Sequence, residues 1–369
     1  MIAIPEAFST SYAKARVKFL EAGAIAELQL ASFKHPLPGR DGEQLATDVA
    51  LEGDPAGPRL LIVSSACHGV EGFGGSGVQV FALHDTEWRA KAREAGVAVL
   101  YIHALNPYGF SHVRRVTQEN VDLNRNFHDF SAPLPVNEGY RRVHPLLFPP
   151  TWPPDAANQA AIQDFVARNG LAAWQAAITG GQYEYPDGLS NGGNAPTWSN
   201  QTVRAILREY AGHASHVAWI DLHTGLGPNG VGERIYAGAR DAAAVARARR
   251  WWGEQVTSLY DGTSASAPLT GLMWTAIYDA APQAEYTGIA MEYGTQPVTD
   301  VLQALRADQW LALHPEAPPE LAAQIKAQVL AAFYTDTDAW KGQVISQARQ
   351  AMFEAVDGLS ASADVRWTA

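Results

Sequence analysis

Two uninterrupted apolar segments restrict the fold of this chain more than any other feature. Residues 59–69 read RLLIVSSACHG and residues 97–106 read VAVLYIHALN, and neither segment alternates between apolar and polar positions. Short continuous apolar runs are typical of strands that are buried on both faces. A helical pattern over roughly residues 77–95 separates them. Strand, helix and strand in this order predict a parallel sheet covered by helices.

Further segments extend this pattern along the chain. Buried strands are predicted at 216–223, 233–239 and 288–295, an edge strand at 47–53 after a turn-rich break at 35–43, and helices at 11–27, 156–169, 199–213 and 240–258. We expect one α/β domain over residues 1–369, with a mixed, mostly parallel central sheet flanked by helices on both faces. An irregular insertion rich in proline and glycine is expected at 129–198. A helical extension, broken at Pro318 and Pro319, is expected at 299–358.

Histidines and carboxylates stand at the ends of the predicted strands. His68 and Glu71 form an H-x-x-E pair after the first strand, His223 ends the strand at 216–223, and Glu292 lies near the end of the strand at 288–295. The carboxyl ends of parallel strands meet at one edge of a sheet. A catalytic zinc ion takes three protein ligands and keeps one position open. His68, Glu71 and His223 could supply these ligands, which leaves Glu292 for proton transfer.

Other interpretations of these residues stay open at this point. An H-x-x-E pair often occurs by chance, and a histidine after a strand is commonly a hydrogen-bonded structural residue. The chain has 11 histidines, and rival ligands are His84, His103, His112, His128 and His216.

A glycine pattern in the same turn offers a different chemistry. Gly72, Gly74 and Gly77 have the G-x-G-x-x-G spacing of a dinucleotide-binding turn. Such a site requires an acidic residue after the next strand to bind the ribose. The next strand ends in IHALNP, which contains no Asp or Glu. A dinucleotide-binding oxidoreductase is therefore only a remote alternative.

A basic and amide-rich segment lies between the proposed ligands. Residues 105–127 read LNPYGFSHVRRVTQENVDLNRNF and include Arg114, Arg115 and Arg125. An arginine binds a carboxylate through two parallel hydrogen bonds, and a neighbouring asparagine can complete the site. The segment is consistent with an anionic substrate group, although surface ion pairs would explain the same arginines.

Taken together, these motifs resemble the zinc carboxypeptidase superfamily, which includes the aspartoacylase and succinylglutamate desuccinylase branch. The resemblance covers about residues 59–296, rests on H-x-x-E, NPYGF and VDLNRNF, and points to a separate bacterial branch. It implies one Zn²⁺ per chain, bound by His68, Glu71 and His223, and Glu292 as the general base and then acid.

The resemblance also implies roles for residues of the basic segment. Asn124 and Arg125 would hold the substrate carboxylate, Arg115 rather than Arg114 would stabilise the oxyanion, and Asp122 would orient the first histidine. Members of the superfamily also carry a mobile tyrosine, for which Tyr260 and Tyr278 are the candidates. Residues 272–274, Leu-Met-Trp, would either line an apolar side-chain pocket or belong to the core.

The expected activity is hydrolysis of an amide or peptide bond next to a free carboxylate. Its substrate would be a small peptide, as for a carboxypeptidase, or an N-acyl amino acid, as for a deacylase. An inactive binding protein on the same fold is a further remote alternative, although the expected positions all carry functional side chains.

Charge and composition limit the partners of the chain. The net charge of −11 argues against nucleic acid or an anionic membrane surface as a partner. Cys67 is the only cysteine, and no apolar run approaches the roughly 20 residues of a membrane span. We therefore expect a cytoplasmic protein without disulfides, and the sequence leaves its oligomeric state open.

Overall fold

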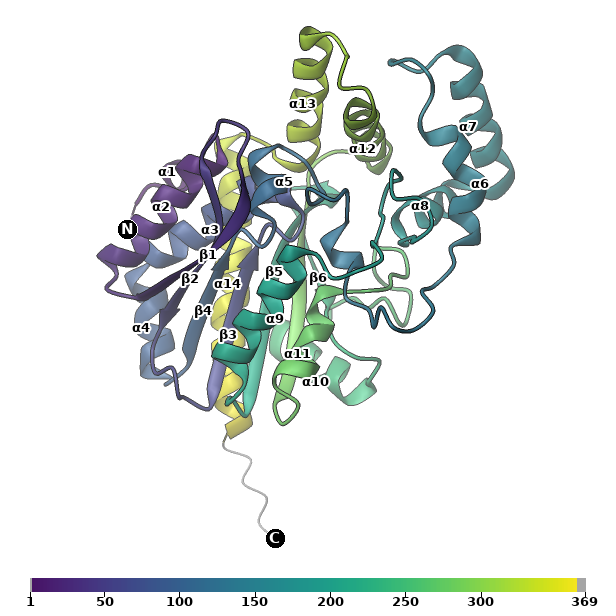
Figure 1. Ribbon diagram of the computed structural model, residues 1–369. Coiled ribbons are helices and arrows are strands. Elements are labelled where there is room, and N and C mark those ends of the chain that lie inside the picture. Colours follow the sequence, from purple (N-terminus) through teal and green to yellow (C-terminus); the bar gives the residue numbers. More distant parts are fainter. Residues whose placement is uncertain (1, 364–369) are drawn as a thin grey trace.

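Seven strands form one mixed sheet in the order β1-β2-β4-β3-β5-β7-β6 in the computed structural model, which describes residues 2–363 (Figure 1). The strands are β1 (Gln29–Pro38), β2 (Gln44–Glu52), β3 (Arg59–Ser65), β4 (Ala98–His103), β5 (His216–Asn229), β6 (Gly232–Tyr236) and β7 (Glu285–Gly294). The four neighbouring strands β4, β3, β5 and β7 are parallel, and the outer pairings are antiparallel. The predicted mixed sheet with a mostly parallel core is confirmed.

Helices cover both faces of this sheet. They are α1 (Ile4–Ala7), α2 (Tyr12–Ile25), α3 (Gly72–His84), α4 (Thr86–Glu94), α5 (Pro107–Ser111), α6 (Glu138–Leu147), α7 (Ala156–Asn169), α8 (Leu171–Thr179), α9 (Trp198–Ala211), α10 (Ala242–Trp252), α11 (Ala276–Ala280), α12 (Val298–Leu313), α13 (Pro319–Phe333) and α14 (Asp338–Ala363), with short 3₁₀ turns η1 (Gly69–Glu71), η2 (Leu123–Arg125) and η3 (Met273–Thr275). Figure 1 shows α9 and α11 on one face and α14 on the other. Apolar residues of β3 and β5 pack alternately toward these two layers, which explains their uninterrupted apolar sequence.

The carboxyl ends of the parallel strands lie under a second group of helices. Figure 1 shows α5, α12 and α13 above this edge, with α6, α7 and α8 beside them. The predicted break in the C-terminal extension is confirmed, because Pro318 precedes α13 and Pro319 is its first residue. No helix within residues 2–363 is sufficiently long and apolar to span a bilayer.

Three predictions about local structure are wrong. The segment 47–53 lies in β2, an interior strand, and the true edge strand is β1, which includes part of the expected turn at 35–43. The polar residues that suggested an edge are buried but paired: the Thr47 hydroxyl donates to the Ala104 carbonyl, and Asp48 forms an ion pair with Arg16 at 2.7 Å. The polar side chains of the alternating pattern therefore bind buried partners within the protein and do not face solvent.

The other two concern helices. The segment 77–95 is two helices that meet at Asp85, whose carboxylate accepts hydrogen bonds from the first turn of α4. The insertion at 129–198, expected to be irregular apart from the helix predicted at 156–169, contains α6 and α8 in addition to α7, which matches that helix.

Candidate metal centre

Two left-handed residues shape the edge of the sheet where the site lies. Ala66 follows β3 with a φ of 59°, and Ala104 follows β4 with a φ of 60°. The two turns are joined because the Leu105 amide donates to the Ser65 carbonyl at 3.0 Å and the Asn106 amide donates to the Ala66 carbonyl at 2.9 Å. A non-glycine residue with positive φ is strained, and such strain is often found at functional sites.

The turn from His68 to Glu71 packs directly on the loop that follows α5. The Gly69 amide donates to the Arg115 carbonyl at 3.0 Å, and the Val70 amide donates to the Arg114 carbonyl at 2.9 Å. A Cβ at Gly69 would collide with the backbone of Gly109 and the residue after it. Glycine is required at position 69 because two backbones meet there.

The glycines of the dinucleotide-like pattern have a packing role. A Cβ at Gly72 would meet the ring of Phe110, and a Cβ at Gly77 would meet the ring of Phe8. Aromatic side chains of the protein therefore occupy the space beside this turn. The structure gives no support to a dinucleotide site here.

Sheet register brings the distant residues to the same place. His223 of β5 is the register partner of Glu292 of β7, and Ser65 at the end of β3 is the partner of Leu222. The turn after β3 therefore places His68 and Glu71 beside His223. All three side chains are buried, with exposed fractions of 4%, 1% and 3%.

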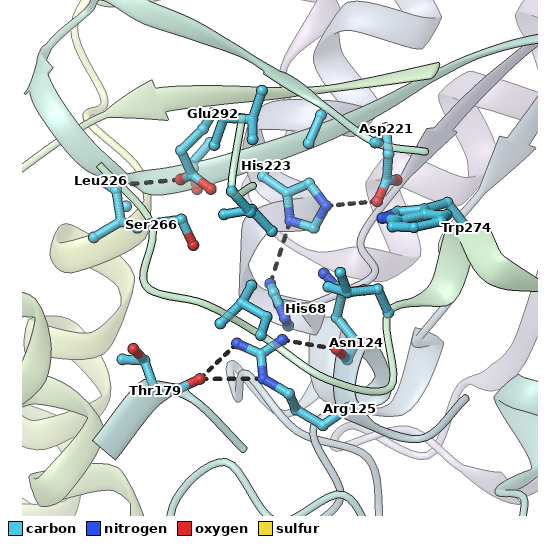
Figure 2. A pocket seen from close by; sticks show the side chains of 18 of the residues that line it. His68, Asn124, Arg125, Thr179, Asp221, His223, Leu226, Ser266, Trp274 and Glu292 are labelled. Carbon is cyan, nitrogen blue, oxygen red and sulfur yellow. Dashed lines mark hydrogen bonds and ion pairs between the residues drawn. The ribbon is translucent and has the colours of Figure 1, made fainter. Parts of the chain in front are cut away.

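His68 and His223 face one another (Figure 2), and the Glu71 carboxylate lies against both. His68 Nδ1 lies 2.8 Å from Glu71 Oε1, His223 Nδ1 lies 3.0 Å from Glu71 Oε2, and the two Nδ1 atoms are 3.3 Å apart. Bonds of about 2.0–2.2 Å to a tetrahedral zinc ion would space its ligand atoms about 3.4 Å apart. Two imidazole nitrogens and a carboxylate at this spacing suit a divalent cation.

The outer nitrogen of each imidazole lies beside an aspartate. His68 Nε2 is 3.1 Å from Asp122 Oδ1, and His223 Nε2 is 2.5 Å from Asp221 Oδ2. With a metal bound, a proton on each outer nitrogen would leave both Nδ1 lone pairs directed inward, which is the tautomer that a metal requires. This arrangement supports the fit of a metal to these residues.

Asp221 is a site residue that our reading of the sequence missed. It stands two positions before His223, and residues i and i+2 of a strand lie on the same face. The D-x-H spacing on a predicted strand could therefore have identified it. Asp221 is itself held by the Ser64 hydroxyl, which accepts a hydrogen bond from the indole of Trp219 at 2.7 Å.

A second set of three potential ligands comprises Cys67, Asp221 and His223. Burial raises the pKa of the Cys67 thiol well above its usual value, and the surrounding carboxylates raise it further. A protonated thiol is a poor metal ligand. The set with His68 and Glu71 is chemically the better one.

The carboxylates of the site have opposite pKa shifts. Burial would raise the pKa of Glu71, but the attraction of His68 and hydrogen bonds from both imidazoles outweigh it and lower that pKa. Burial, reinforced by the negative charge of Glu71, raises the pKa of Glu292 from its usual value to about 8. Two neighbouring carboxylates with separated pKa values are suited to different roles, one as a ligand and one as a proton carrier.

The arginines of the basic segment take separate places. The Arg115 guanidinium lies among the ligands, with Nη1 3.1 Å from Glu71 Oε1, Nε 3.2 Å from Asp122 Oδ2 and Nη2 2.8 Å from His68 Nε2. The contact of Arg115 with His68 Nε2 requires a lone pair on that nitrogen, whereas the contact of the same nitrogen with Asp122 requires a proton on it. The two hydrogen bonds are therefore alternatives. Arg114 instead turns toward Asp308, which it meets at 3.0 Å.

Arg125 and Asn124 line the same cavity and are held by the backbone. The Arg125 guanidinium donates to the Thr179 carbonyl from Nε at 3.1 Å and from Nη2 at 2.7 Å, and to the Asn124 carbonyl from Nη1 (Figure 2). Asn124 Oδ1 accepts a hydrogen bond from the Met273 amide. Thr179 was not identified from the sequence, because it lies in the insertion and meets Arg125 only through the fold.

The two candidate tyrosines are engaged elsewhere. The Tyr260 hydroxyl donates to the Gly238 carbonyl at 2.8 Å, and the Tyr278 hydroxyl accepts from the Ala239 amide at 2.8 Å. The tyrosines that line the cavity, within the part of the chain that is described, are Tyr236 and Tyr286.

One cavity of about 110 Å³ connects these groups. Its polar lining includes His68, Arg115, Asn124, Arg125, Asp221, His223 and Glu292. Leu272 and Trp274 also line it, while Met273 between them is buried in the core, so the Leu-Met-Trp run contributes both to the cavity wall and to the core.

Comparisons with known proteins identify a family and a similar fold for this chain. The family described as "Protein of unknown function (DUF2817)" matches residues 8–347. No curated protein matches the chain. The structure of thrombin activatable fibrinolysis inhibitor is similar at 11% identity and a TM-score of 0.50, over 96% of this chain and 78% of that protein.

Two other solved structures are similar to this chain. Bovine thrombin-activatable fibrinolysis inhibitor, in complex with tick carboxypeptidase inhibitor, has 9% identity and a TM-score of 0.45, over 96% of this chain and 98% of that one. A metallo-carboxypeptidase from Burkholderia cenocepacia has 13% identity and a TM-score of 0.37, over 86% of this chain and 66% of that one. The predicted metallocarboxypeptidase-like α/β fold is confirmed.

Proposed function

The chain belongs to the DUF2817 family, and we propose that it is a zinc-dependent hydrolase that cleaves an amide or peptide bond next to a free carboxylate. The observation that carries this proposal is the joint position of three kinds of group. Two metal-ligand histidines, the high-pKa Glu292 and the buried Arg125 all line one cavity. Metal ligands alone would suit a structural site, and an arginine alone would suit a binding site. Their combination suits hydrolysis of an anionic substrate.

His68, Glu71 and His223 would hold the ion. Zinc bound there would lower the pKa of a bound water to about 7 and would polarise a carbonyl. Glu292 would serve as the proton carrier: the Leu226 amide donates to its Oε1 at 3.1 Å, which would leave Oε2 to take a proton and to deliver it to the leaving nitrogen.

The two arginines would act on different parts of the substrate. Arg125 is fixed by the Thr179 carbonyl, and its remaining N–H groups can bind a carboxylate at a constant position. Arg115 lies beside Glu71, where its charge can stabilise an oxyanion near the ligands. Binding of the substrate carboxylate is thereby assigned to Arg125, and stabilisation of the transition state to Arg115.

Metal analysis combined with a substrate panel tests the proposal. We expect about one zinc ion per chain after purification, and loss of hydrolysis on chelation with recovery on adding zinc. The panel contains peptides with free and amidated C-termini and N-acyl amino acids. Turnover of free-carboxylate substrates only is the expected result. Preference for N-acyl amino acids over peptides would identify a deacylase, and zinc binding with no hydrolysis of any amide would contradict the proposal.

A further inference from the structure

The backbone that carries Arg115 is held in an unfavourable conformation. Val113, two residues before it, has a φ of 50° and a buried side chain. A β-branched residue with a positive φ is a conformational outlier, because its side chain crowds the backbone there. Such a conformation persists only where surrounding contacts fix it. The contacts of Val113 and its neighbours therefore decide where Arg115 lies.

One side of this segment is joined to the turn that carries two of the proposed metal ligands. The Gly69 amide donates to the Arg115 carbonyl, and the Val70 amide donates to the Arg114 carbonyl. These two hydrogen bonds connect the backbone of the segment with that of the turn. A shift of the segment would thus displace the Arg115 guanidinium relative to the ligands and strain or break both bonds.

A buried ionic network holds the other side of the segment. Asp308 of α12 is only 4% exposed and lies 3.0 Å from Arg114 Nε and 2.6 Å from Lys326 Nζ. Lys326 comes from α13 and also donates to the carbonyl of the strained Val113 at 3.2 Å. Arg114 Nη2 donates to Gln309 Oε1, next to Asp308, at 2.8 Å. One carboxylate therefore ties the segment to both helices, which lie above the carboxyl edge of the sheet (Figure 1).

The charges of this network suit a fixed position. Burial by itself would raise the pKa of Asp308, but the positive charges of Lys326 and Arg114 outweigh it and lower that pKa, so the carboxylate stays ionised. A buried ion pair often stabilises a fold no more than apolar residues of similar volume. Stability alone therefore does not explain three buried charges at this place, whereas the need to hold a strained segment does.

We propose that Asp308 is a positioning residue, which fixes the segment 113–115 through Arg114 and Lys326 and thereby places the Arg115 guanidinium beside the metal ligands. The inference rests on the proposed function, in which Arg115 stabilises the oxyanion. Asp308 itself is not among the described residues that line the cavity. It acts on turnover through the backbone, because a displacement of about 1 Å in a catalytic group can lower the rate about 10²-fold.

Two variants of the network and one control test this role. Asp308→Asn removes the charge that both cations face. Arg114→Lys is milder, because lysine keeps the charge but lacks the planar group that meets Asp308 and Gln309 together. Asp85→Asn is the matched control, since Asp85 is also buried and pairs with Arg349 of α14 at 2.6 Å. Urea unfolding establishes that each variant is folded and compares the losses of stability.

Steady-state kinetics at saturating zinc give the first readout. We expect kcat to fall roughly 10- to 100-fold in Asp308→Asn and less in Arg114→Lys. KM should stay within about twofold, because Arg125 keeps its own contacts. Asp85→Asn should retain both constants of the wild type. An unchanged kcat in Asp308→Asn, or the same loss in Asp85→Asn, overturns the inference and leaves the hydrolase intact.

Hydrogen exchange of the metal-depleted protein gives a readout that needs neither substrate nor zinc. The Gly69 and Val70 amides should exchange roughly tenfold faster in Asp308→Asn than in the wild type or Asp85→Asn, because their acceptors belong to the released segment. Faster exchange of these amides, in a protein that hydrolyses no substrate, supports positioning by Asp308 and overturns the hydrolase. Unchanged exchange at both amides overturns the inference, whatever the activity. Should Asp308→Asn not fold, the same comparisons with Arg114→Lys decide.

Discussion

His223 and Glu292 are register partners on the neighbouring parallel strands β5 and β7. Backbone hydrogen bonds of the sheet, and not a flexible loop, therefore set the separation between the proposed metal ligand and the proposed proton carrier. A slip of one residue in this register would turn Glu292 to the opposite face of the sheet. The relative position of the two groups is consequently a property of the sheet.

Replacing the proton carrier should abolish catalysis while leaving the metal in place. We expect Glu292→Gln to lower kcat by about 10²–10⁴, because amide oxygens cannot accept and return the proton. Zinc content, measured alongside steady-state kinetics, should be unchanged. Glu233→Gln is the control, since Glu233 is the register partner of Glu292 on β6. Loss of zinc in parallel with activity would contradict the assigned role.

The aspartate behind His223 should tune metal affinity. Asp221→Asn weakens the hydrogen bond that fixes the imidazole tautomer, so we expect zinc affinity to fall about 10- to 100-fold. Competition with a chromophoric chelator measures this change. Asp85→Asn, which alters a buried aspartate at the start of α4, should leave zinc affinity unchanged. Equal affinity in Asp221→Asn and the wild type would rule out this role for Asp221.

Arg125 and Arg115 should affect different kinetic constants. Arg125→Lys removes paired hydrogen bonds to a carboxylate that is present in both the ground state and the transition state, so KM should rise at similar kcat. Arg115→Lys removes stabilisation that develops in the transition state, so kcat should fall by roughly 10² or more. Steady-state kinetics on one substrate give both constants. The same change in both variants would exclude separate roles.

Stability of the metal-depleted protein should depend on Glu292 and pH. The folded pKa of Glu292 is raised to about 8. Its contribution to the free energy of unfolding is therefore fully present below the unfolded pKa and is lost as pH rises from there through the folded pKa. We expect the free energy of unfolding of wild type to fall relative to Glu292→Gln between about pH 5 and 8, by roughly 3–4 kcal/mol. Urea unfolding at several pH values measures the difference. His223, whose pKa is also raised, is common to both proteins. A constant difference across this range would refute the prediction.

The close approach at Gly69 should tolerate no side chain. Gly69→Ala forces a methyl group against the backbone of Gly109, and we expect about 1–3 kcal/mol of destabilisation by urea unfolding, with weaker zinc binding. Gly342→Ala is the control, because a Cβ there meets no atom within 4 Å in the middle of a helix. That substitution should be neutral or stabilise by up to about 1 kcal/mol. Equal stability of the two variants would show that the backbones can separate.

Much of this architecture could be predicted from local sequence. The apolar strands β3 and β4 and the helix between them set a parallel core, and the carboxyl ends of parallel strands necessarily lie together. His68, Glu71 and His223 were found for that reason, and the structure brings them within hydrogen-bond distance. Asp221 could have been found from its spacing on the strand.

Other features depend on contacts that no local pattern records. Thr179 reaches Arg125 from the insertion, and Tyr286 approaches the cavity because Gly288 leaves room for its ring. The position of β2 was misjudged because burial of Thr47 and Asp48 depends on partners in α2 and in the turn after β4. In each case, long-range partners decide what the local sequence leaves open.

Arg125 takes its orientation from the last residue of α8, whereas the metal ligands take theirs from the sheet. The proposed ion site and the proposed carboxylate site are therefore positioned by different parts of the chain. Under the proposed function, a change within the segment 129–198 would alter how Arg125 meets a substrate while the sheet still sets the positions of His223 and Glu292.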